Sequence, residues 1–83
     1  METKTTQESQ MVKVFEIDCF DIPLDDIPKR NEIFIALDPQ KRLGDKTWSV
    51  LKSNGRNYPP AAIGLFWDKP YAIKCANNLA FPK

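Results

Sequence analysis

The order of hydrophobic and polar residues predicts extended chain over most of the sequence and a helix at its end. From Met11 to Ile22 (MVKVFEIDCFDI), apolar side chains fall on both sides of an extended chain. A strand accommodates this pattern when both of its faces are partly covered, or when a bulge shifts its phase. The run EIFIALD (32–38) is short, continuously apolar and followed by a proline, which predicts a central strand.

Residues 46–53 (KTWSVLKS) admit two interpretations. Asp45 could cap a short helix that would end at Asn54-Gly55. Alternatively the segment is a strand, which its threonine, tryptophan and valine favour, and Asn54-Gly55 is a two-residue hairpin turn. We expect the strand, with the short helix as the alternative.

A strand and a helix adjoin directly near the C-terminus. Pro59-Pro60 enforces an extended approach to AAIGLFW (61–67), and Gly64 inside this strand indicates a bulge or a close approach of another group. Asp68 then suits a helix N-cap, and Pro70 is tolerated in the first turn. Apolar residues follow at the helical spacing of three and four: Tyr71, Ala72, Cys75, Ala76 and Leu79.

Together these elements predict a single small α+β domain. Residues 11–83 would form an antiparallel sheet of about four strands followed by a C-terminal helix that covers the sheet (β-β-β-β-α). Residues 1–10 (METKTTQESQ) are polar and lack periodicity, so we expect a disordered leader. A chain of 83 residues buries only about 60% of its unfolded surface, so its core must be nearly complete.

The composition predicts a cytoplasmic protein. No apolar run approaches the roughly 18 residues that span a bilayer, and the N-terminus lacks the pattern of a signal peptide. Two cysteines, Cys19 and Cys75, are too few for a disulfide scaffold. We expect both to be reduced and half-buried, where cysteine behaves as a small hydrophobic residue.

Residues that carry catalysis or bind metals and phosphates are sparse. The chain has no histidine, no CxxC pair and no glycine-rich phosphate loop among its three glycines. Asp25 and Asp26 are adjacent, but a proline-flanked loop is typical of solvated turn residues. We therefore expect a protein that is not an enzyme and that carries no cofactor and no metal.

The net charge of +1 conceals an uneven distribution along the chain. Residues 15–38 carry seven acidic and two basic side chains, a net charge of −5. Residues 39–74 carry seven basic and two acidic side chains, a net charge of +5. Either the two segments face and neutralise each other, or the second offers a basic face to a polyanion.

Aromatic residues among the basic ones favour a non-enzymatic nucleic-acid-binding protein, with single strands as the expected ligand. A sheet face that offers rings for stacking on bases and cations for phosphates suits this task. Trp48 is equally suited to the core of so small a domain. The candidate binding residues are Lys41, Arg42, Lys46, Trp48, Lys52, Arg56 and Tyr58.

One stretch resembles a known family. Pro60, then Gly64 followed by LFW, and then Asp68 at the start of the last helix resemble the final strand-to-helix junction of the transcriptional positive cofactor family of single-strand binders. The resemblance covers residues 46–80. It implies four strands followed by a helix, dimerisation through the helices, and nucleic-acid binding. The family carries basic residues just before the glycine, where this chain has AAI at 61–63.

The alternative function is that of a small protein-binding accessory or inhibitor protein, of the motif-free kind often encoded by phages and mobile elements. Such a protein would dock on a larger partner through the acidic, proline-rich loop DIPLDDIPKRN (21–31) and an edge strand. Internal pairing of the basic residues 39–58 with the acidic segment would favour this alternative. An open sheet edge would also favour a homodimer. The candidate docking residues are Asp21, Asp25, Asp26, Lys29 and Arg30.

Overall fold

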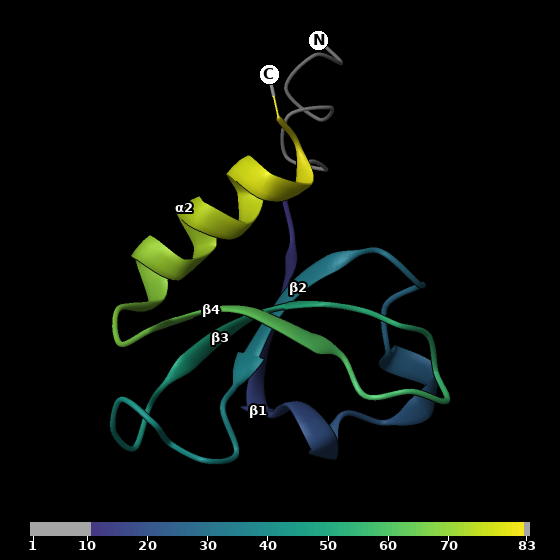
Figure 1. Cartoon of the computed structure of the whole chain (residues 1–83), viewed down its shortest axis with the longest axis horizontal. Coiled ribbons are helices and arrows are strands. Elements are labelled where there is room, and N and C mark those ends of the chain that lie inside the picture. The colour runs from purple at the N-terminus through teal and green to yellow at the C-terminus, as the bar shows by residue number, and fades with distance from the viewer. Residues whose placement is uncertain (1–10, 83) are drawn as a thin grey trace, which may run out of the picture.

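In the computed structural model, which describes residues 11–82, four strands form one sheet and a helix crosses one of its faces (Figure 1). The predicted α+β fold, with four strands followed by a C-terminal helix, is confirmed. The leader expected over residues 1–10 lies outside the described residues. The elements of the sheet and the helix are β1 (Lys13–Asp18), β2 (Ile33–Leu37), β3 (Trp48–Lys52), β4 (Ala61–Phe66) and α2 (Lys69–Ala80), with the strands side by side in that order.

One strand pair departs from the antiparallel sheet that the sequence predicts. β1 runs parallel to β2, whereas β2 with β3 and β3 with β4 are antiparallel. A parallel neighbour requires a crossover, because the chain must return to the same end of the sheet. Residues 19–32 make this crossover through two 3-10 turns, η1 (Cys19–Asp21) and η2 (Leu24–Asp26). The first strand therefore ends at Asp18. The apolar pattern had predicted that it would continue to Ile22.

The crossover and α2 cover opposite faces of the sheet, so the domain has two apolar clusters. This two-sided cover, with a register shift between Val14 and Asp18, explains why apolar residues lie on both sides of β1. Alternate residues of β2 and β3 serve opposite clusters, as the pleat of a strand requires. The cluster beneath α2 consists of Val12, Ile35, Trp48 and Val50, together with Ala72 and Ala76 of the helix itself. The cluster beneath the crossover consists of Phe34, Ala36 and Leu51, together with Ile22 of the crossover itself.

The strand interpretation of residues 46–53 is confirmed, but the hairpin turn expected after it does not form. A longer loop, residues 53–60, joins β3 to β4. The side-chain amide of Asn54 closes this loop by donating to the Pro59 carbonyl at 2.9 Å. Gly55 adopts φ +100°, a conformation that favours glycine. The loop begins at buried Ser53, whose hydroxyl donates to the Pro28 carbonyl of the crossover at 2.7 Å.

The junction between β4 and α2 follows the sequence closely. Asp68 is the N-cap residue and a proline lies in the first turn. The bulge and the close approach of another group that the sequence predicted at Gly64 are both present. The register of β4 shifts beside it, and a Cβ there would lie 3.1 Å from the Phe66 ring. The buried face of α2 differs from the predicted one: Ala72 and Ala76 are buried, and Ile73 and Ala80 pack against the same cluster. Tyr71 and Leu79 remain exposed.

Candidate binding surfaces

The crossover between β1 and β2 presents two large apolar side chains among carboxylates. Phe20 in η1 is 69% exposed and Leu24 in η2 is 60% exposed. Asp21, Asp25 and Asp26, from the same two turns, are exposed as well. We call these five residues the acidic surface. Phe20 was not among the predicted docking residues, because the apolar pattern extended the first strand to Ile22 and so included Phe20 in it. Apolar residues spaced among acidic ones in a loop could have indicated its role.

The chain beneath the acidic surface is anchored to the sheet. Ile22 is buried between the two turns and belongs to the cluster beneath the crossover. Pro28 is buried, and its carbonyl accepts the hydrogen bond from Ser53. The loop is therefore long because it covers the second face of the sheet. Lys29 and Arg30, the two basic candidates of this loop, lie exposed after its buried proline.

The residues predicted to bind nucleic acid do not gather on one sheet face. Residues at the two ends of β3 are separated by roughly 13 Å, since a strand rises about 3.3 Å per residue. Three candidates lie in the loop before β3, one is buried at the start of the strand, and three lie at its far end or in the next loop. These groups are Lys41, Arg42 and Lys46; Trp48; and Lys52, Arg56 and Tyr58.

Trp48 is part of the core beneath α2. It is only 6% exposed and packs with the buried residues of that cluster. The ammonium of Lys69 lies 5.3 Å from the centroid of its ring, so a cation from the start of α2 covers it. This burial contradicts the stacking role predicted for Trp48, since a nucleic-acid base could not reach the face of its ring.

The ion pairs connect the acidic segment to the basic segment. Within residues 11–82, every pair that the structure records joins an acid of segment 15–38 to a base of segment 39–74. These pairs are Arg42 with Asp38 at 2.9 Å, Arg56 with Asp25 at 2.7 Å, and Lys69 with Glu16 at 2.6 Å. This pattern favours the interpretation that the two segments neutralise each other.

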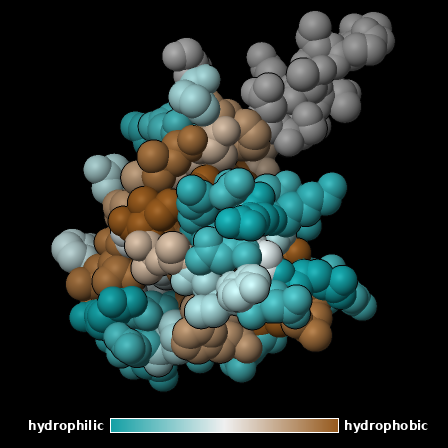
Figure 2. Space-filling model, turned by 45° about the vertical axis from the view of Figure 1, so that its right-hand side comes forward, coloured by the Kyte–Doolittle hydropathy of each residue, from teal (hydrophilic) through white to brown (hydrophobic). Residues whose placement is uncertain are grey.

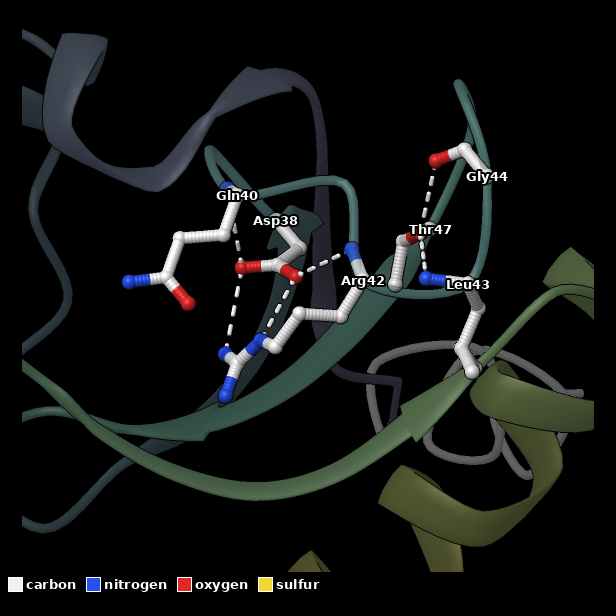
Figure 3. Close-up of polar contacts among 6 residues, drawn as sticks. All are labelled: Asp38, Gln40, Arg42, Leu43, Gly44 and Thr47. Carbon is white, nitrogen blue, oxygen red and sulfur yellow. Dashed lines mark hydrogen bonds and ion pairs between the residues drawn. The ribbon is translucent and has the colours of Figure 1, made fainter.

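Asp38 organises the loop before β3 (Figure 3). Its buried carboxylate accepts hydrogen bonds from Nε and Nη2 of Arg42, at 2.9 and 3.1 Å, and from the backbone N–H groups of Arg42 and Gln40, at 3.1 and 3.3 Å. The Arg42 guanidinium and these donors hold the pKa of Asp38 below its ordinary value, although burial opposes them. The hydroxyl of Thr47 accepts from the Leu43 N–H and donates to the Gly44 carbonyl. Arg42 is thus engaged in its own loop.

At the far edge of the sheet, β4 presents apolar residues to solvent. None of its six residues is charged, and Ala61, Ala62 and Ile63 are exposed. Figure 2 shows hydrophobic side chains in a band along and beneath the helix. At the end of β4, Trp67 is 75% exposed. A hollow of about 310 Å³ lies there, lined by Leu65, Phe66, Trp67, Asp68 and Tyr71.

Within residues 11–82, no group of three or more Cys, Asp and Glu residues could hold a metal ion. In the same range, no helix is long and apolar enough to cross a membrane. Cys19 and Cys75 are free and half-buried, as expected. Burial raises the pKa of the Cys19 thiol, and the charges of Asp38 and Asp18 raise it further. This favours the less reactive thiol form.

Comparison of the chain with protein-family models, with curated proteins and with solved structures finds no match. These comparisons therefore assign no family, and the resemblance to the transcriptional positive cofactor family stays a prediction.

Proposed function

We propose that this protein is a non-enzymatic protein-binding module that docks on a larger partner through the acidic surface. The observation that carries the proposal is the exposure of Phe20 and Leu24 on an anchored segment between carboxylates. Apolar area in water costs about 25 cal/mol per Å². Burial of these two side chains by a partner would therefore stabilise the complex.

The acidic surface defines the chemistry of the partner. Apolar anchors supply affinity when they fill pockets, and the surrounding charges set the orientation and the rate of encounter. The matching surface is a positively charged groove that contains apolar pockets. Arg56 does not block such a partner, because its pair with Asp25 is exposed, and exposed pairs contribute little to stability. Arg56 also donates to the Leu24 carbonyl at 3.3 Å, which helps to hold η2 in place.

Affinity capture from a lysate of the source cells, quantified by mass spectrometry, tests this proposal. The unchanged chain is compared with a Phe20→Ser, Leu24→Ser double variant. A Leu43→Ser, Phe81→Ser double variant is the matched control, because it removes an exposed leucine and an exposed phenylalanine elsewhere. We expect a partner whose capture falls at least tenfold with the first variant and stays unchanged with the control.

Charge reversal provides an independent arm of the same experiment. Asp25→Lys with Asp26→Lys should abolish capture, because it places two cations against the basic groove of the partner. Raised salt should weaken capture by the unchanged chain. A partner retained equally by the unchanged chain, the serine double variant and the lysine double variant would contradict the proposal.

A second candidate function is single-stranded nucleic-acid binding at the end of β3. One observation favours it. Lys52, Arg56 and Tyr58 lie at the same end of that strand, and Tyr58 is 68% exposed. An exposed ring beside cations can stack on a base while phosphates are neutralised. Arg56 would have to leave Asp25 for this role, and Tyr58→Ala should remove the binding.

A further inference from the structure

We propose that two copies of this chain form a symmetric dimer, in which β4 pairs antiparallel with β4 of the second copy and Tyr58 of each copy fills the hollow beside Trp67 of the other. The dimer does not rest on the proposed function, because neither β4 nor the hollow beside Trp67 includes any of the five residues of the acidic surface. Three features of the molecule support this dimer: the uncharged edge strand β4, the positions of Tyr58 and the hollow at opposite ends of β4, and the exposed aromatic area.

The two edges of the sheet differ in how they are protected. Unpaired edges are templates for further strands, and proteins guard them with charges, prolines or bulges. Both edge strands have a register irregularity, but only β1 also carries charges, at Lys13, Glu16 and Asp18. β4 has no charged residue along Ala61–Phe66. An uncharged strand can face a copy of itself without like charges meeting.

The two ends of β4 are complementary under a two-fold axis. Antiparallel pairing about the middle of the strand, between Ile63 and Gly64, brings the residues before β4 beside the residues that follow it in the other copy. Pro60 then lies opposite Trp67, and Tyr58 lies opposite the start of α2. The hollow at that place is lined in part by Trp67 and Tyr71. Because the interface has two-fold symmetry, Tyr58 of each copy contacts the hollow of the other copy, and the same contact is made twice.

The exposed aromatic area on this side is a large part of what a stable dimer requires. Tyr58, Trp67 and Tyr71 are each more than half exposed. An aromatic side chain buries about 150–250 Å², so these three offer roughly 300–500 Å² in each copy. The exposed residues of β4 and its main chain add to this sum. The total approaches the roughly 800 Å² per partner that is typical of stable protein complexes.

Sedimentation of the full chain over a range of concentrations tests the dimer. We expect twice the 9.5 kDa mass of one chain at the higher concentrations. Ile63→Lys should give a monomer, since it places two like charges at the centre of the interface. The matched control is Ile17→Lys, because Ile17 lies on the other edge strand and is 41% exposed, against 46% for Ile63. This control should remain dimeric.

Ile63→Lys could fail as a test if it disturbed folding, so Tyr58→Ala is measured as well. Tyr58 lies in an exposed loop, and its replacement should leave the fold intact. It should raise the dimer dissociation constant at least tenfold while the far-ultraviolet circular dichroism stays unchanged. An unchanged chain that is monomeric at every concentration would overturn the proposal. So would a folded Ile63→Lys chain that dimerises, or a Tyr58→Ala chain that dimerises as strongly as the unchanged one. Capture of a larger partner by the acidic surface leaves these readings unaffected.

Discussion

The two tryptophans of this chain should respond in opposite ways to replacement by alanine. Trp48 is buried beneath α2, whereas Trp67 is largely exposed at the end of β4. Removal of a buried tryptophan costs about 3–5 kcal/mol. A domain of this size has about 4–12 kcal/mol of stability in total, at 0.05–0.15 kcal/mol per residue. Trp48→Ala should therefore remove a quarter or more of the stability, while Trp67→Ala should change it by about 0.5 kcal/mol or less.

Urea denaturation followed by far-ultraviolet circular dichroism measures this contrast without relying on tryptophan fluorescence. With a slope near 1 kcal/mol per molar urea, the midpoint for Trp48→Ala should fall by about 3 M or more. Trp67 lies at the proposed dimer interface, so both variants are compared in dilute protein, where the chain is monomeric. Equal midpoints for Trp48→Ala and the unchanged chain would refute the assignment of Trp48 to the core. A loss for Trp67→Ala as large as that for Trp48→Ala would refute the contrast between the two sites.

Three further predictions concern the loops and the charges. The pKa of Asp38 is lowered in the folded chain, so its contribution to stability is present above the ordinary aspartate pKa of about 3.9 and is lost as the pH falls through the folded value. Asp38→Asn should therefore lower the melting temperature at neutral pH and flatten its fall in acid, whereas Asp45→Asn, at an exposed acid of the same loop, should leave both unchanged. Gly55→Ala should cost about 1–2 kcal/mol in urea denaturation, because only the positive φ opposes the new methyl group and no atom lies within 4 Å of it. Glu16→Gln should leave the fold intact, since its pair with Lys69 is exposed, and a large loss of stability would show that this pair is structural.

Local patterns predicted the elements of this fold well. β2 was recognisable because a short apolar run ends at Asp38-Pro39, and α2 was recognisable from its N-cap residue and the proline in its first turn. The direction of β1 was not recognisable in this way. Strand direction depends on the path of the crossover, and no local periodicity encodes whether residues 19–32 return the chain to the same end of the sheet.

The binding surfaces were harder to predict than the fold, for two physical reasons. An aromatic residue on a strand has the same local pattern whether it faces the core or solvent, so the sequence left the role of Trp48 open. Opposite charges in two segments give no indication of which side chains meet. The pairs of Arg56 with Asp25 and of Lys69 with Glu16 arise only when the fold brings distant segments of the chain to the same place.

The most direct test of the account is the anisotropy of a labelled single-stranded oligonucleotide, titrated with the full chain at about 50 and 200 mM salt. The central claim is that the acidic and basic segments neutralise each other and leave an acidic surface for a protein partner. It predicts no binding at micromolar protein concentrations, even at the lower salt. Micromolar binding with a logarithmic salt slope of about −2 to −3.5, as for three to five neutralised phosphates, would contradict it. Loss of that binding in Tyr58→Ala would then assign the function to the end of β3.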